Sequence, residues 1–152
     1  MQTIAAIVPM SVGYLRAHAS RLIQEHYDEV CAVKDLQALD PMWDEYEAVE
    51  RRGKAFVLGA QVGDELVGYS LTFVGPHIHY ANTIAAHNDV VFLTKEHRRS
   101  GLGLELIQAT ERLARDKGAV YITWHAKPGS ALERMMPRMG YRAHETVFLK
   151  RL

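Results

Sequence analysis

The chain has 152 residues, 48% of them hydrophobic, and its 18 Lys and Arg balance its 18 Asp and Glu. This length predicts one domain over residues 1–152, with a sizeable core, and is short for two domains. Zero net charge gives no general attraction to nucleic acid or to anionic membranes. A single cysteine, Cys31, excludes an intramolecular disulfide, and no apolar run has membrane-spanning length. We therefore expect a soluble cytoplasmic protein with no membrane contact.

The first third of the chain predicts one edge strand and two helices. Residues 4–8 suit a short strand that Pro9 closes, and Ser11 suits the N-cap of a helix running to about Val30. Asp40 followed by Pro41 has the form of a second helix start, and Gly53 is a suitable end. These helices carry aromatic side chains that fit either a core or a substrate pocket.

Two strand-like runs follow, at residues 55–61 and 65–74, and a turn at residues 62–64 makes them a predicted hairpin. Gly75 and Pro76 are expected to end the second strand, and residues 77–88 show little periodicity. His77 and His79 could share one face of a strand, but no third ligand stands at a recognisable spacing. We expect no metal site.

Residues 90–118 have the pattern of a buried strand, a polar turn with glycines, and an amphipathic helix. Val90 to Leu93 are four apolar residues in a row, Gly101 and Gly103 follow, and apolar residues then recur at helical spacing as far as Gly118. A strand that turns sharply into a helix points unpaired N–H groups and the positive end of the helix dipole at one spot. The sequence therefore predicts an anion site at the start of this helix.

Two nucleotide-binding motifs do not fit this segment. A dinucleotide fingerprint needs a third glycine where Leu106 stands, and a Walker-type phosphate loop needs Gly-Lys-Ser or Gly-Lys-Thr, which the chain lacks. Downstream, we expect a strand at residues 119–125, a short helix at residues 130–139, and a last strand that opens at Gly140 and contains Phe148 and Leu149. A helix that crosses between two strands returns the chain in the same direction, so at least one strand pair is parallel.

The segment Arg98-Arg99-Ser100-Gly101-Leu102-Gly103 resembles the R-x-x-G-x-G motif of the GCN5-related N-acetyltransferase (GNAT) family. The order of elements around it matches well over roughly the last 65 residues, and the first 50 match by general layout. The resemblance implies an α/β fold with a mixed, mostly antiparallel sheet, flanked by helices, whose parallel pair splays apart at the cofactor site. It also implies acetyl-coenzyme A as cosubstrate. The implied cofactor-binding residues are Phe92, Leu93, Arg98, Arg99, Ser100, Gly101, Leu102 and Gly103.

In this family the strand that feeds the glycine loop often carries a carboxylate that takes the proton from the amine. Strand alternation predicts His87, Asp89, Val91 and Leu93 on one side, with Asn88, Val90 and Phe92 on the other. His87 and Asp89 are therefore the candidate base, because a neighbouring carboxylate would orient the imidazole and raise its basicity. The alternative is that both are polar residues at a strand entrance, hydrogen-bonded to a neighbouring loop.

The position at which the family often has its general acid departs from the family pattern. The family often places a tyrosine four residues before the glycine of its final Gly-Phe pair, whereas here the pair is Gly140-Tyr141 and the position holds Met136, which cannot donate a proton. Tyr80, Tyr121, His125 or water are the substitutes, and Tyr80 is the candidate we name. Each tyrosine also fits plain core packing.

The leading functional hypothesis is transfer of an acetyl group from acetyl-CoA to a primary amine of a small molecule, peptide or protein, by direct attack. Cys31 lies in the N-terminal region without a matching base, so an acetyl-enzyme is not expected. The competing hypothesis is a non-catalytic acyl-CoA-binding regulatory module that kept the loop and lost the acid. Modification of a nucleic acid is not expected without a basic patch, and a homodimer is expected because two-fold dimers are the commonest oligomers.

Overall fold

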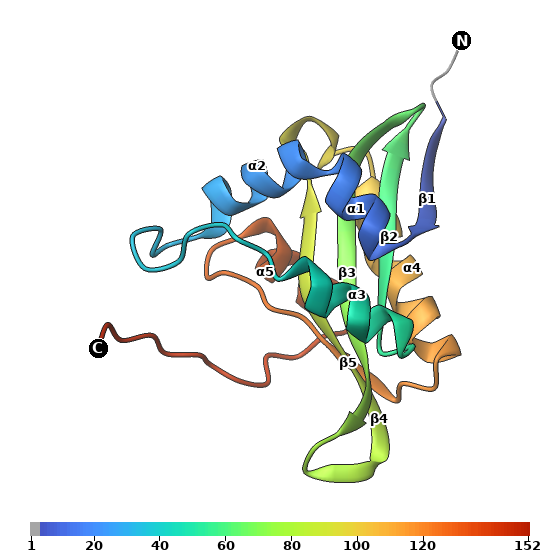
Figure 1. The fold of residues 1–152 in the computed structure, drawn as a ribbon, viewed down its shortest axis with the longest axis vertical. Helices are drawn as coiled ribbons and strands as arrows, with labels where there is room; N and C mark the ends of the chain where they lie inside the picture. Colours follow the sequence, from blue (N-terminus) through green and yellow to red (C-terminus); the bar gives the residue numbers. More distant parts are fainter. Residues whose placement is uncertain (1–3) are drawn as a thin grey trace.

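The computed structural model describes residues 4–152. It is an α/β protein in which three helices follow the first strand, three strands come next, and a long helix then leads to the last strand (Figure 1). The strands are β1 (Ala5–Met10), β2 (Ala55–Val62), β3 (Glu65–His77), β4 (Tyr80–Leu93) and β5 (Tyr121–Thr123). The helices are α1 (Val12–His18), α2 (Ser20–Val30), α3 (Trp43–Arg51), α4 (Leu102–Asp116) and α5 (Ala131–Met135), with short 3-10 turns η1 (Lys95–His97) and η2 (Met136–Met139).

The five strands form one sheet in the order β1-β2-β3-β4-β5. The first three pairings are antiparallel, and β4 and β5, which α4 connects, run parallel. This mixed sheet with flanking helices confirms the predicted fold class. None of the helices among residues 4–152 is long and apolar enough to span a bilayer.

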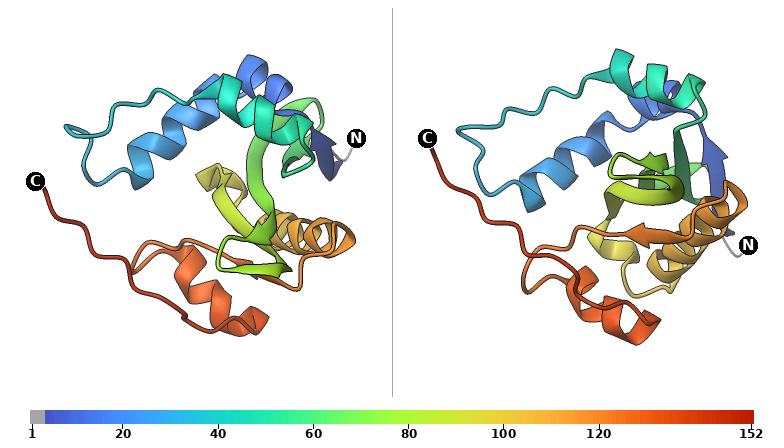
Figure 2. Two further views of the ribbon diagram at one scale, coloured as in Figure 1. Left: turned by 60° about the horizontal axis from the view of Figure 1, so that its bottom comes forward. Right: turned by 90° about the horizontal axis from the view of Figure 1, so that it is seen from below.

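One face of the sheet is covered by α1, α2 and α3, as Figure 2 shows with the sheet between two helical layers. Apolar side chains of α1 and α2, among them Leu15 and Leu22, pack there on Tyr69, Leu71 and Phe92 of the central strands. The predicted cap at Ser11 is confirmed, since its hydroxyl accepts the Tyr14 N–H at 3.0 Å.

The opposite face is covered by α4. Leu102 and Leu106 pack there against Leu58, Val67 and Leu93. Gly118 follows the end of α4 with φ of +89°, a backbone conformation that suits glycine, as the sequence predicted. This packing fixes the N-terminus of α4 beside the end of β4.

Several predicted boundaries are wrong. The first helix is two helices that break at Ala19, and β3 continues through Gly75 and Pro76 to His77. Pro76 has no backbone N–H to donate, but β2 stops pairing with β3 at Phe73. The missing N–H therefore breaks no hydrogen bond with β2, and the proline is tolerated. Residues 77–88, where the sequence shows little periodicity, lie mostly in β4.

The predicted last strand is also wrong. Residues 140–152 have no regular secondary structure, and in the figures the chain end extends away from the body of the protein. The side chains of Val147, Phe148 and Leu149 are 80%, 89% and 66% exposed. An apolar β-type pattern favours an extended segment, but it does not supply the neighbouring strand that the segment needs.

Candidate active site

The parallel strands β4 and β5 pair over a short distance only. Their register runs from Ala85 opposite Tyr121 to His87 opposite Thr123, and β4 then continues for six residues with no strand on that side. Along residues 88–93, β4 therefore has no strand partner on the side away from β3, although the Leu93 carbonyl accepts a hydrogen bond from Arg98 Nε. An unpaired edge of this kind fits the predicted splaying of the parallel pair.

A β-bulge lies at the same point of β4. Leu71 of β3 is opposite Val90 and Thr72 is opposite Asn88, so Asp89 is an extra residue. The bulge overturns the predicted alternation. His87 and Asp89 lie on the α1–α3 face, whereas Val91 and Leu93 pack on the α4 face.

Asn88 braces the bulge from the α4 face. Its side chain is 2% exposed, and its amide nitrogen lies 3.0–3.2 Å from Ser70 Oγ, the Leu71 carbonyl, Thr72 Oγ1 and the Val90 carbonyl. Buried polar groups are costly unless hydrogen-bonded, so this arrangement specifies one local conformation. Asn88 thereby sets the direction in which Asp89 points.

Asp89 is exposed and hydrogen-bonded to the N-terminal helical layer. The Tyr46 hydroxyl of α3 donates to Asp89 Oδ2 at 2.7 Å, and the Tyr46 ring stacks on Phe73 at 5.9 Å. Burial, and next the hydrogen bond to Asp89, raise the pKa of Tyr46 above its usual value of 10.0. Tyr46 therefore stays protonated as a donor, and the second carboxylate oxygen is available to another group.

His87 lies on the same face as Asp89 but has a different partner. Its Nδ1 is 2.8 Å from Thr123 Oγ1, and burial, then the nearby His77 and His125, lower its pKa below 6.5. The expected pairing of His87 with Asp89, with a raised basicity, is not what the structure has. The reason is that Thr123, opposite His87 on β5, is the nearer hydrogen-bonding side chain.

Tyr80 lies at the β3–β4 hairpin and is 64% exposed. Its ring is 4.9 Å from that of His77, which is 6.3 Å from that of His87. The structure thus connects Tyr80 to His87 through His77 and leaves it outside the Asp89–Tyr46 pair. Among residues 4–152 no group of three or more metal-ligating side chains is close enough to hold an ion.

The glycine loop follows β4 directly and leads into α4. Gly101 caps the helix with φ of +87°, and Ser100 Oγ is 3.3 Å from the Leu102 N–H. Within the described chain, no backbone acceptor pairs with the N–H groups of Gly101, Gly103 or Leu104. Three donors and the positive end of a 15-residue helix therefore converge at one point. This arrangement suits a phosphate group.

The two arginines before the glycines have different surroundings. Arg98 donates through Nε to the Leu93 carbonyl at 2.9 Å and through both terminal nitrogens to Glu29 of α2, each at 2.7 Å. Its guanidinium also lies 5.6 Å from the centre of the Phe92 ring. The Arg98 side chain is thus used within the protein, and the exposed Arg99 is the arginine available to a phosphate.

Phe92 and Leu93 point to opposite faces at the end of β4. Phe92 packs in the α1–α3 core and stacks on His26 at 5.0 Å, while Leu93 contacts the α4 core. His26 Nδ1 lies 2.7 Å from the Tyr69 hydroxyl, and burial is the main cause that lowers the pKa of His26. Both predicted cofactor residues therefore bury their side chains, and only their backbone is available to a ligand.

Sequence reasoning missed several residues of this site. Glu29, His26 and Tyr69 come from distant elements, and their partners depend on how α2 packs on the sheet. Asn88 did carry a signal, because it is a polar residue between the apolar positions of a strand. Met136, at the position where the family often has a tyrosine, lies in η2 and is half-buried.

Comparison with known proteins agrees with this geometry. The model of the Acetyltransferase (GNAT) family matches residues 20–141. No protein in a search of curated sequences matches the chain.

Solved structures share the fold. An aminoglycoside acetyltransferase from an uncultured soil metagenomic sample superposes with a TM-score of 0.76 at 15% identity, covering 98% of this chain and 99% of its own. Ribosomal-protein-alanine N-acetyltransferase from Brucella melitensis biovar Abortus 2308 gives 0.75 at 16% identity, covering 98% of each chain. A transcriptional regulator from Bacillus halodurans C-125 gives 0.70 at 21% identity, covering 97% and 99%. At such identities the likeness is evidence of fold alone, but the family match spans most of the sequence. The chain belongs to the GNAT family of acetyltransferases.

Proposed function

We propose that this acetyltransferase moves an acetyl group from acetyl-CoA to a primary amine of a small molecule or protein by direct attack. The observation that carries the proposal is the convergence of three features along residues 87–104. The free edge of β4 begins at residue 88, the Asp89 carboxylate stands at the bulge, and the unpaired amides of Gly101, Gly103 and Leu104 follow. Acetyl-CoA carries a thioester at one end of a long arm and a pyrophosphate at the other. The edge of β4 with Asp89 suits the thioester end, and the unpaired amides suit the pyrophosphate.

The amides at the start of α4 would hold the pyrophosphate, with Arg99 beside them and Ser100 Oγ fixing the turn. Gly103 supports this role, because a Cβ built there meets only Leu93 Cδ2 at 3.4 Å, so the protein itself has room for a side chain. A glycine at that position leaves space above the amide for a ligand. The bound cosubstrate would supply the activated acetyl group. The residues of this chain would position the amine and transfer its protons.

Asp89 is the proposed acceptor of the amine proton, directly or through one water. It is exposed, and Tyr46 holds one of its oxygens. His87, with a lowered pKa, is uncharged at neutral pH and lines the same face. We propose that His87 either orients the amine substrate or accepts a proton from it.

The proton for the departing thiolate has three proposed sources. Tyr80 is connected to His87 through the His77 ring, and the Tyr46 hydroxyl is a donor on the Asp89 side. Water is the third, because coenzyme A is a tolerable leaving group near neutral pH. Cys31 ends α2 with Sγ 4.0 Å from Gln37 Oε1, and it shares no contact with His87 or Asp89, which supports direct transfer.

The names of two structural neighbours supply the acceptor classes to be tested: aminoglycosides, and an alanine of a ribosomal protein. The experiment is a thiol-release assay with acetyl-CoA against aminoglycosides, polyamines, amino acids and peptides. We expect release that depends on the amine, with an acetylated product by mass spectrometry. Tight acetyl-CoA binding without amine-dependent release would instead support the regulatory acyl-CoA module.

A further inference from the structure

Four ring side chains lie together next to the proposed base, and we call them the ring cluster: His77, Tyr80, His87 and Tyr121. The ring centres of His77 and Tyr80 are 4.9 Å apart, those of His77 and His87 are 6.3 Å apart, and those of His87 and Tyr121 are 6.2 Å apart. Tyr80 and Tyr121 are 64% and 41% exposed, so these two rings are not core packing. The ring cluster is therefore available to a ligand.

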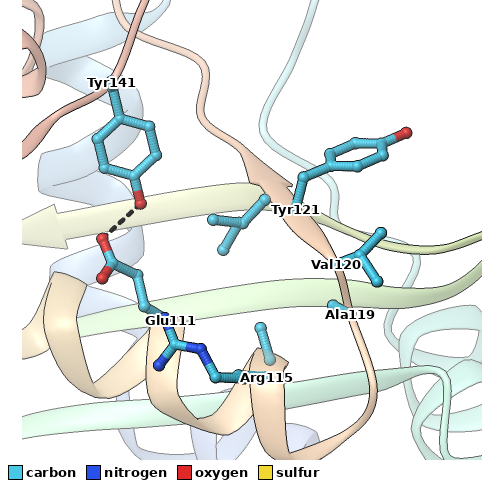
Figure 3. Close-up of a pocket in the computed structure, with 8 residues that line it drawn as sticks. Glu111, Arg115, Ala119, Val120, Tyr121 and Tyr141 are labelled. Atoms are coloured by element: carbon cyan, nitrogen blue, oxygen red, sulfur yellow. Dashed lines mark hydrogen bonds between the residues drawn. The ribbon is translucent and has the colours of Figure 1, made fainter.

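Tyr121 lies on the same face of the sheet as His87. Paired residues of neighbouring strands point to one side, and Thr123, two residues after Tyr121, is opposite His87. Ile122 points the other way and packs on the α4 side. Figure 3 shows the Tyr121 ring directed away from Tyr141, whose hydroxyl donates to α4. The ring cluster thus belongs to the α1–α3 face, where the proposed base stands.

An irregular hairpin brings the other rings to this place. Pro76 is opposite Ile84 and His77 is opposite Tyr80, so residues 81–83 of β4 have no partner on β3. Extra residues on one strand bend the pair. The bent hairpin carries the His77 ring back to the His87 ring.

Hydrogen bonds hold two of the rings in place. The His79 backbone N–H donates to His77 Nδ1 at 3.0 Å, and His87 Nδ1 is 2.8 Å from Thr123 Oγ1. Side chains that are already fixed lose little conformational entropy when a ligand binds. The ring cluster is in this sense a prepared binding surface.

The spacing between Asp89 and the ring cluster limits the shape of the ligand. His87 and Asp89 are two residues apart on one face, which is about 7 Å of strand. An amine at the Asp89 carboxylate therefore places a group over His87 when about two or three carbons separate that group from the nitrogen. The neighbouring Tyr121 ring meets the His87 ring edge-on, and a flat aryl group suits such a corner, because aromatic rings prefer offset-stacked and edge-to-face contacts.

The charges around the ring cluster disfavour a polycation. Burial, and next the nearby His77 and His125, lower the pKa of His87, and Glu145 raises it by a smaller amount. The several ammonium groups of a polyamine or an aminoglycoside need several carboxylates as partners, which imidazoles do not supply. One ammonium group has a partner in Asp89.

We propose that the acceptor is an arylalkylamine, in which about two or three carbons join a single primary amine to a flat aryl ring, and that the ring cluster holds this aryl ring. The inference rests on the proposed acetyl transfer. The amine nitrogen forms its bond to the acetyl carbon as the carbon–sulfur bond breaks, Asp89 takes the amine proton, and the acid returns a proton to sulfur. The aryl ring takes no part in these steps and fixes the direction of the amine.

The first experiment compares kcat/KM for phenethylamine with that for n-hexylamine, which carries the same single charge without a ring. Spermidine and kanamycin are the polycations of the panel. We expect phenethylamine to exceed n-hexylamine by about tenfold. Equal values for these two amines, or a polycation as the best acceptor, would overturn the inference and leave acetyl transfer standing.

Variants of Tyr121 test the ring contact itself. Tyr121→Leu should reduce the preference for phenethylamine over n-hexylamine about fivefold, whereas Tyr121→Phe, which keeps the ring and removes the hydroxyl, should retain it. Tyr14→Leu is the matched control, because Tyr14 of α1 is 42% exposed and lies outside the ring cluster. An unchanged preference in Tyr121→Leu contradicts the inference.

A binding measurement separates this inference from the proposed function. Calorimetry with phenethylamine and n-hexylamine, in the presence and absence of coenzyme A, should show tighter binding of the amine that carries a ring. Ring-dependent binding without thiol release from any amine would overturn acetyl transfer and support the aryl site. Equal binding of the two amines would overturn the aryl site.

Discussion

Arg98 and Glu29 are joined by two hydrogen bonds of 2.7 Å each, which tie the start of the glycine loop to helix α2. Arg98 also holds the carbonyl of Leu93, the last residue of β4. Residues 69 positions apart in sequence therefore fix the geometry where the proposed phosphate site meets the strand. The arginine of the glycine motif is in this protein a positioning residue.

Glu29→Ala should weaken acetyl-CoA binding while the protein stays folded. Both side chains are 32% exposed, so the pair contributes about 1 kcal/mol or less, which corresponds to about a fivefold loss of affinity. Calorimetric titration with acetyl-CoA checks the change. Glu25→Ala, which removes an exposed pair with Arg21 on the same helix, should leave affinity unchanged.

Asn88→Ala should cost stability and turnover together. The substitution leaves buried hydroxyls without their donor, at about 1–3 kcal/mol, and it frees the bulge that directs Asp89. Urea unfolding and kcat measure the two effects. Asn82→Ala, at an exposed position of the same strand, should change neither, and an active, fully stable Asn88→Ala would contradict the bracing role.

The two glycines of the loop should respond differently to alanine. Gly101 has φ of +87°, so Gly101→Ala strains the turn itself and should lower thermal stability. Gly103→Ala should fold normally but bind acetyl-CoA about tenfold more weakly, because the methyl group occupies the ligand's approach. Equal affinity in a folded Gly103→Ala protein would place the pyrophosphate elsewhere.

The pH dependence should show the lowered pKa of His87. Burial and two neighbouring histidines hold that pKa below 6.5, so His87 is neutral above it and charged only in more acidic solution. Activity that needs neutral His87 should rise with pH through a value below 6.5 and then level off. The free energy of unfolding should also fall as pH drops through this range, because the unfolded chain binds the proton more readily.

His87→Ala should remove this limb of the pH profile and lower kcat/KM, by about 10²-fold if the imidazole accepts the proton. His79→Ala, at an exposed hairpin position, is the control. An unchanged profile in His87→Ala would assign the titration to another group.

Much of this site could be predicted from sequence because its signals are local. The run Val90 to Leu93, the two glycines and the periodicity of α4 are short-range patterns, and they predicted the strand, the turn and the helix. The parallel pairing followed from the crossover helix. The bulge at Asp89 could not be predicted, since it depends on how Asn88 meets Ser70 and Thr72 of β3.

The N-terminal contacts could be predicted only in part. Aromatic side chains on the first helices were expected to fit a core or a substrate pocket, and Tyr46 is one of them. The contact of Glu29 with Arg98 could not be predicted, because it depends on how α2 lies across the sheet and no spacing along the chain encodes it. The prediction of a last strand was wrong for a different reason. Val147 to Leu149 do have strand character, but a strand needs a partner edge, and residues 4–152 of one chain do not provide it.

The central claim is that Asp89 removes a proton from an amine that attacks acetyl-CoA directly. The measurement is kcat for the best amine and calorimetric affinity for acetyl-CoA, in the wild-type protein and in Asp89→Asn. We predict a kcat lower by about 10²-fold or more with acetyl-CoA affinity unchanged, because several strand residues separate the carboxylate from the amides proposed to bind phosphate. An Asp89→Asn protein that retains full kcat, or that loses acetyl-CoA binding in proportion to its activity, would contradict this account.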